Sequence, residues 1–95
     1  MNPEIRAVSF STATIRSGRV AVAKIDCSGI APYELVCESS STGFDLQVLP
    51  TRARQGRFIL VGVRIHRRLG APRNLCIIRF AASGQCSSAS LTVLA

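Results

Sequence analysis

The chain has 95 residues, enough for one domain with a single thin core and with little room for a second lobe around a catalytic cleft. Apolar residues make up 47% of the chain and charged residues 18%, a composition that excludes a disordered protein. The formal net charge is +7. The longest apolar run, Phe58 to Val63, is far too short to span a membrane, so we expect no membrane segment. These properties predict a single domain over residues 1–95.

Short apolar segments bounded by Ser, Gly and Pro clusters recur along the chain at near-regular spacing. This pattern predicts strands over residues 5–10, 19–27, 34–38, 44–49, 57–65, 75–82 and 87–94, with residues 12–15 continuing the first strand after a kink. We expect Pro50 to end the fourth strand or to lie in an edge strand, because proline cannot donate a hydrogen bond to its neighbour. No segment has a helical period, so essentially no helix is expected. The fold class predicted is all-β: one immunoglobulin-like sandwich of about seven antiparallel strands.

The order of turns and strands over residues 18–94 resembles bacterial and phage immunoglobulin-like repeat modules, the Big-like β-sandwich modules. The segments that carry the resemblance are Cys27 to Pro32, Ser39-Ser40-Ser41, Val48-Leu49-Pro50, Gln55-Gly56, Phe80 to Gly84 and Ser88 to Val93. The chain departs from the pattern in its short, arginine-rich stretch from Pro50 to Gly56, and it contains no Trp. The resemblance implies a non-catalytic structural role, such as capsid decoration on a phage virion or a subunit of an extracellular assembly. It implies no particular binding residue.

Positive charge is concentrated in the second half of the chain. Residues 1–45 contain four basic and five acidic side chains, whereas residues 46–95 contain eight arginines and no acid. We expect five of these arginines to gather on one side or end of the sandwich and to bind an anionic partner: Arg52, Arg54, Arg64, Arg67 and Arg68. The alternative is a solvated arginine-rich loop that keeps a small protein soluble.

The partner predicted for these arginines is an acidic protein surface, such as a capsid or tail lattice. Nucleic acid is the second candidate, and it is less favoured because aromatic side chains for base stacking are not interleaved with the arginines. Exposed edge strands would allow β-augmentation or homo-oligomers. A third hypothesis is that the chain is one repeat of a secreted bacterial adhesin. The amino terminus lacks the charged and apolar regions of a signal peptide, and the location predicted is the virion surface or the extracellular space.

The four cysteines, Cys27, Cys37, Cys76 and Cys86, form two pairs with equal separation in the sequence. Their even number allows one or two disulfides, in three connectivities. Reduced thiols that act as small apolar side chains are the alternative. We expect no metal site, because the closely spaced cysteine pairs typical of zinc sites are absent from the sequence.

The sequence contains no recognisable catalytic constellation. His66 is the only histidine, no acid neighbours it, and no Gly-x-Ser-x-Gly motif is present. Asp26 and Asp45 fall in different predicted strands and give no sign of forming a carboxylate pair. We therefore expect a protein that is not an enzyme and that needs no cofactor.

Overall fold

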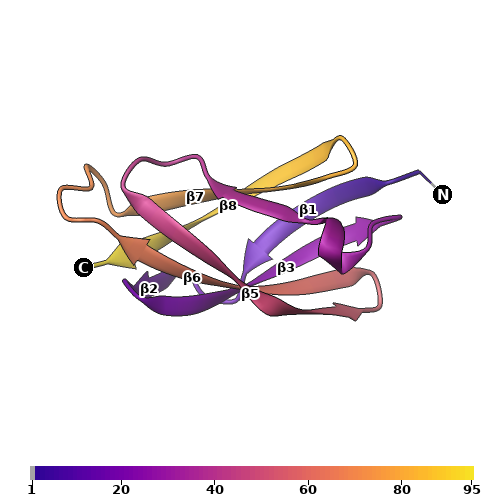
Figure 1. Cartoon of the computed structure of the whole chain (residues 1–95), viewed down its shortest axis with the longest axis horizontal. Helices are drawn as coiled ribbons and strands as arrows, with labels where there is room; N and C mark the ends of the chain where they lie inside the picture. Colours follow the sequence, from indigo (N-terminus) through magenta and orange to yellow (C-terminus); the bar gives the residue numbers. More distant parts are fainter. Residues whose placement is uncertain (1) are drawn as a thin grey trace.

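The computed structural model describes residues 2–95, which form two four-stranded sheets packed together (Figure 1). One sheet has the strand order β1-β3-β6-β5 and the other β2-β8-β7-β4. The strands are β1 (Glu4–Phe10), β2 (Thr14–Arg16), β3 (Arg19–Ser28), β4 (Val36–Ser39), β5 (Phe44–Gln55), β6 (Phe58–Arg67), β7 (Leu75–Ala82) and β8 (Gln85–Leu94). The helical content of the described residues is one 3₁₀ turn, η1 (Pro32–Glu34). The predicted all-β class is confirmed.

The molecule is elongated, 44 × 21 × 20 Å, and the two ends of the chain lie at its opposite ends (Figure 1). The η1 turn and the hairpin turn between β5 and β6 lie near the amino-terminal end. The β2–β3 turn and the β6–β7 loop lie at the other end, beside the carboxyl terminus. Residues far apart in the sequence therefore meet at each end of the sandwich.

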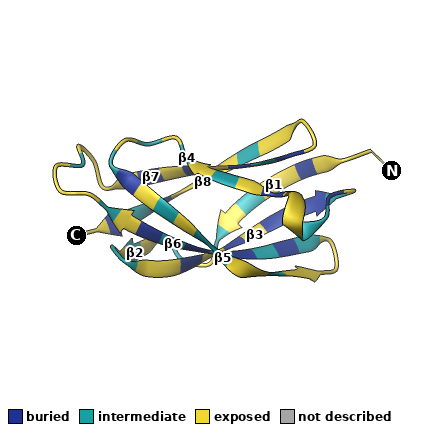
Figure 2. Ribbon diagram, viewed as in Figure 1, coloured by how far each residue is buried: buried dark blue, intermediate teal, exposed yellow. Residues whose placement is uncertain are grey.

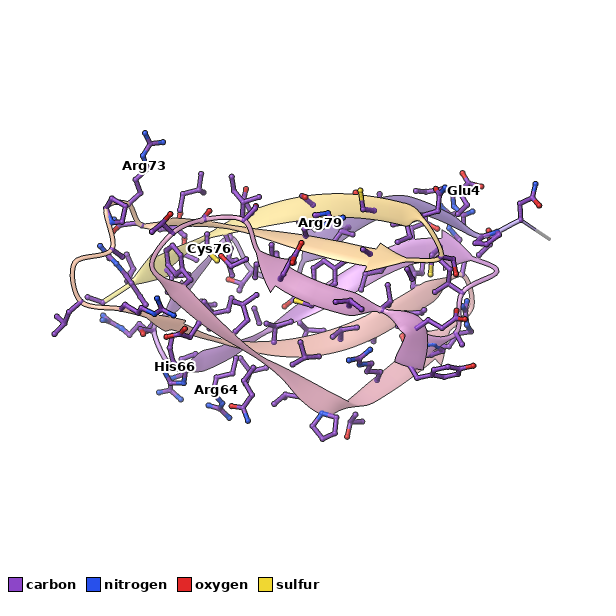
Figure 3. All side chains as sticks on the ribbon, turned by 45° about the horizontal axis from the view of Figure 1, so that its top comes forward. Glu4, Arg64, His66, Arg73, Cys76 and Arg79 are labelled. Carbon is purple, nitrogen blue, oxygen red and sulfur yellow. The ribbon has the colours of Figure 1, made fainter. Side chains whose placement is uncertain are left out.

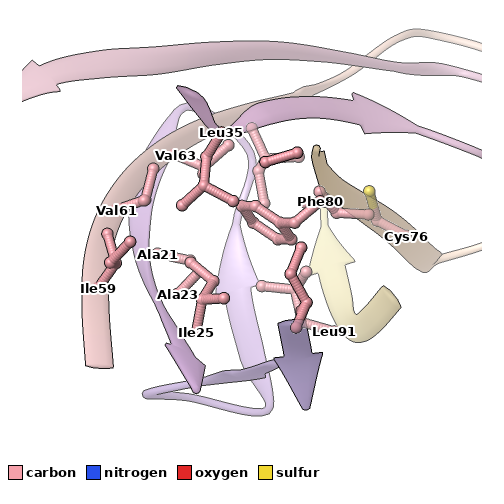
Figure 4. Close-up of a cluster of buried hydrophobic side chains, with 14 of the residues drawn as sticks. Ala21, Ala23, Ile25, Leu35, Ile59, Val61, Val63, Cys76, Phe80 and Leu91 are labelled. Atoms are coloured by element: carbon pink, nitrogen blue, oxygen red, sulfur yellow. The ribbon is translucent and has the colours of Figure 1, made fainter. Parts of the chain in front are cut away.

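The core lies between the sheets, where alternate residues of β3, β6 and β7 are buried (Figures 2 and 4). Phe80 is the largest fully buried side chain, and its ring centroid lies 6.2 Å from that of Phe10. The other buried side chains are mostly aliphatic, in keeping with the scarcity of aromatic residues. The fully buried set also includes Ile25, Cys27, Ile59, Val61, Val63, Ile65, Cys76, Ile78, Leu91 and Val93.

The first predicted strand is two strands in the structure, because the chain changes sheets after Phe10. β1 pairs with β3 in antiparallel fashion, whereas β2 pairs with β8 in parallel fashion. The Thr12 hydroxyl donates to the Thr14 carbonyl oxygen at 3.0 Å and helps to hold the connecting bend. The structure thus has eight strands in its described residues and one parallel pair, instead of about seven antiparallel strands.

Pro50 does not end its strand. β5 continues through Pro50 to Gln55 at the edge of its sheet, so the edge alternative is the correct one. The pairing of β5 with β6 shifts register between Val48 and Arg52, which marks a bulge around the proline. The arginine-rich stretch that separates the predicted strands 44–49 and 57–65 is therefore mostly strand.

Gly62 of β6 lies opposite this bulge and permits close packing across it. A Cβ atom at Gly62 would lie 2.9 Å from Leu49 Cδ1, which is closer than van der Waals contact allows. The close approach of Leu49 therefore explains why a glycine lies inside this strand.

Candidate functional site

The five arginines predicted to form one binding patch lie in two separate groups. Arg52 and Arg54 belong to β5 and reach toward the η1 segment, near the amino-terminal end of the molecule. Arg64, Arg67 and Arg68 lie at the end of β6, near the carboxyl terminus. The expectation that all five gather on one side or end is therefore wrong, because Arg52 and Arg54 lie near the turn of the β5–β6 hairpin, whereas the other three lie at its open end.

Arg52 and Arg54 support the backbone around η1. Arg52 Nη1 donates to the carbonyl oxygens of Pro32 and Leu35, at 2.9 and 2.7 Å. Arg54 Nη2 donates to the Ile30 carbonyl oxygen. The Pro32 oxygen also accepts from the Leu35 backbone N–H, and the two guanidinium groups supply donors to the Leu35 and Ile30 oxygens.

Arg64 and Arg67 are also held by backbone carbonyls, at the other end of the molecule. Arg64 Nη1 donates to the Gly18 carbonyl oxygen at 2.7 Å, which ties β6 to the β2–β3 turn. Arg67 Nη1 lies 3.4 Å from the Val93 carbonyl oxygen of the opposite sheet, and its backbone N–H donates to Ser17 Oγ at 2.8 Å. Both side chains are half-buried, and these contacts hold their guanidinium groups in place.

Folding brings three further arginines to this end. β2 places Arg16 beside Leu94, the start of β3 places Arg19 beside Ile65, and Arg73 lies in the β6–β7 loop. All three are exposed, and none takes part in a side-chain hydrogen bond or ion pair with another residue in the range 2–95. We call the resulting surface the basic end, and it consists of Arg16, Arg19, Arg64, His66, Arg67, Arg68 and Arg73. Figure 3 labels Arg64, His66 and Arg73 of this group.

Asp45 is the one acidic side chain of the described residues at the basic end, and it is already paired. Arg68 Nε donates to Asp45 Oδ2 at 2.9 Å, and Arg68 Nη2 binds the other carboxylate oxygen. These hydrogen bonds, more than any other cause, lower the pKa of Asp45 below its usual range. Asp45 therefore stays ionised and neutralises Arg68, which leaves the other arginines of the basic end without a neighbouring counter-charge.

Three of the four remaining acids form ion pairs elsewhere, and Glu34 accepts a hydrogen bond from the Ala31 backbone N–H. Asp26 is buried on the outer side of β3, and it accepts from Arg57 Nε at 3.1 Å and from Arg6 Nε at 3.0 Å. Glu38 pairs with Arg79 in the opposite sheet. Because these pairs cancel charge locally, the excess positive charge of the protein is concentrated at the basic end.

The arrangement of the basic end suits anion binding. A guanidinium group offers N–H donors in a planar fork that matches carboxylate or phosphate oxygens. Carbonyl contacts fix Arg64 and Arg67, so less side-chain entropy is lost when they bind an anion. Leu69, at the tip of the adjoining loop, is fully exposed. Among residues 2–95 no group of three or more His, Cys, Asp or Glu side chains is arranged to hold a metal ion.

The four cysteines are free thiols in the structure. Cys27 and Cys76 are buried in the core, Cys37 is half-buried and Cys86 is exposed. Burial raises the pKa of Cys37 to about 11 and also raises that of Cys76. Since the thiolate is the reactive form, these two thiols are chemically protected, and Cys86 is the accessible one.

Comparisons of the chain with protein family models, with curated proteins and with solved structures find no match. The described part of the chain has no helix with the length and apolar character needed to cross a membrane. The distribution of charge at the basic end is therefore the main guide to function.

Proposed function

We propose that this chain is a non-catalytic binding module with an immunoglobulin-like fold, and that its basic end docks on the acidic surface of a larger protein assembly. The observation that carries the proposal is the exposure of Arg16, Arg19 and Arg73 around the fixed guanidinium groups of Arg64 and Arg67. Positive charge gathered in this way attracts an acidic partner and accelerates its association.

The order of strands supports the immunoglobulin-like part of the proposal. In constant-type immunoglobulin sandwiches, strands A, B, E and D form one sheet and C, F and G the other. Taking β1 as strand A gives the order A-B-E-D for the sheet β1-β3-β6-β5. The second sheet then corresponds to G-F-C, with β2 added beside strand G as a continuation of strand A.

The family resemblance suggests the setting of this docking: the surface of a phage virion or another extracellular assembly. The edge strands favour the basic end over strand addition as the mode of attachment. A bulge and Pro50 interrupt the β5 edge, and β4 at the edge of the other sheet spans only Val36–Ser39. Short, bulged or proline-containing edges are poor templates for a further strand.

An acidic protein is favoured over nucleic acid because the basic end lacks an exposed aromatic side chain among the described residues. Phe44, the aromatic residue closest to it in the sheet, is buried in the core. Tyr33 is strongly exposed, but it lies in η1 near the other end of the molecule. Proteins that bind single-stranded nucleic acid combine positive charge with aromatic residues on which the bases stack.

The proposal is tested by binding to polyglutamate, single-stranded DNA and double-stranded DNA at low salt. The variant R16Q/R73Q removes two exposed charges from the basic end. The matched control K24Q/R79Q removes the same charge from the outer faces of the two sheets. We expect R16Q/R73Q to weaken polyglutamate binding about fivefold and the control to change it less than twofold.

Two results would overturn this proposal. Equal losses in the two variants would show that only net charge matters. Tighter binding to DNA than to polyglutamate, with a steep dependence on salt, would identify a nucleic-acid-binding domain instead. Co-sedimentation of the protein with purified particles of the host assembly then tests whether it docks on a virion or another extracellular assembly.

A further inference from the structure

A hollow of about 450 Å³ opens beside η1, near the opposite end of the molecule from the basic end. Its volume is within the usual range for small-molecule and peptide sites. Apart from Arg52, the residues that line it are valine, leucine, two prolines and Tyr33, which stands at the rim with 83% of its surface exposed. The lining residues are Pro32, Tyr33, Val48, Leu49, Pro50 and Arg52.

Arg52 is the one charged side chain in the lining, and part of its guanidinium group is unused. Its Nη1 atom is held by the carbonyl oxygens of Pro32 and Leu35. Its Nε and Nη2 atoms make no hydrogen bond with any residue of the described chain. No buried side-chain nitrogen or oxygen among these residues lacks a partner, so Nε and Nη2 are open to solvent. Arg52 therefore presents free donors from a fixed position in an apolar hollow.

Arg52 also has no ion-pair partner: none of the ion pairs of residues 2–95 involves it. Its neighbour Arg54, on the same side of β5, is likewise bound to carbonyl groups and not to an acid. A half-buried cation without a counter-ion, next to apolar walls, is complementary to a carboxylate that carries an apolar group.

We propose that this hollow binds a carboxylate attached to an apolar group, with Arg52 Nε and Nη2 donating to its two oxygens. The apolar group packs against Val48, Leu49 and the two prolines, and Tyr33 covers it from the rim. The carboxylate belongs either to a small organic acid or to the carboxyl terminus of an extended peptide. This site is separate from the basic end and is independent of the docking role proposed above.

NMR titration of the ¹⁵N-labelled protein with 3-phenylpropionate tests the proposal, with 3-phenylpropanol as the neutral control. We expect saturable shifts in the amide signals around Tyr33, Val48 and Arg52, and affinity for the acid about tenfold above that for the alcohol. The variant R52Q should abolish this preference, and Y33S should weaken binding of both compounds. The control K24Q removes the same charge from the outer face of β3 and should change neither affinity.

A pair of apolar peptides, one with a free carboxyl terminus and one amidated, distinguishes the two sources of the carboxylate. Tighter binding of the free peptide than of 3-phenylpropionate indicates a peptide ligand, and weaker binding indicates a small acid. Equal affinity for acid and alcohol, or an equal loss in R52Q and K24Q, would overturn the proposal. If R52Q does not fold, the variant Y33S tests the proposal instead. Unchanged binding of the acid by Y33S would also overturn the proposal.

Discussion

Gly43 holds together the β4–β5 turn and the β6–β7 loop that carries part of the basic end. Its φ angle is +96°, and its carbonyl oxygen accepts a hydrogen bond from the Arg68 backbone N–H at 2.8 Å. A Cβ atom at Gly43 would lie 2.7 Å from Ala71 Cβ and 2.9 Å from Ala71 Cα. The substitution G43A therefore adds both backbone strain and a steric clash with the neighbouring loop.

The two contributions can be separated with a matched variant. Gly84 has a φ angle of +76°, and a Cβ atom there would meet no atom within 4 Å. We expect G84A to cost about 1–2 kcal/mol from the left-handed backbone alone. G43A should cost about 1–3 kcal/mol more, because the clash involves backbone as well as side-chain atoms and forces the loop to move.

Urea unfolding of the two variants measures these costs, and ¹⁵N NMR spectra show where the structure changes. G43A should shift the amide signals of residues 68–74, whereas G84A should leave them unchanged. Equal loss of stability in the two variants, within about 0.5 kcal/mol, would refute the packing argument and with it the placement of this loop against the β4–β5 turn.

Three further variants or measurements test other parts of the structure. R52Q should lower the free energy of unfolding by about 1–3 kcal/mol, because two backbone carbonyls lose a charged donor, whereas R73Q should change it by less than about 0.5 kcal/mol in urea titrations. The pKa of Asp26 is lowered, chiefly by its hydrogen bond with Arg57, so its contribution to stability is present above the usual carboxyl pKa and is lost as the pH falls through the lowered value. Thermal unfolding should accordingly show a smaller acid-induced decline in D26N than in the wild type, and equal declines would contradict the ion pairs. A thiol reagent at neutral pH should label one cysteine rapidly, and mass spectrometry should identify it as Cys86; rapid labelling of Cys37 would contradict its burial and raised pKa.

The strands were predictable from the sequence because inward and outward residues alternate between clear turn signals. Ser83-Gly84 and Ser17-Gly18, for example, separate long apolar segments, and the structure has turns at both. The division of the first segment between two sheets was not predictable, since it depends on which neighbours each half can reach. The continuation of β5 through Pro50 also depends on context, because a proline is tolerated only where its nitrogen faces away from the neighbouring strand.

The positive charge of the candidate site was predictable from the sequence, but the residues that form the site were not. Counting charges along the chain directs attention to residues 52–73, yet Arg52 and Arg54 are held by carbonyls around η1. Arg16 and Arg19 come from the half of the chain with no excess of positive charge, and they join the basic end through pairing with β8 and β6. Pairing over such distances in the sequence leaves no local signal.

NMR mapping of polyglutamate binding is the most direct test of the central claim that the basic end is a docking surface. A titration of the ¹⁵N-labelled protein at low salt should shift the amide signals of residues 16–19 and 64–73 first, and added salt should reverse these shifts. Shifts spread evenly over the surface, or concentrated around Lys24 and Arg57 on the outer face of the first sheet, would contradict the claim.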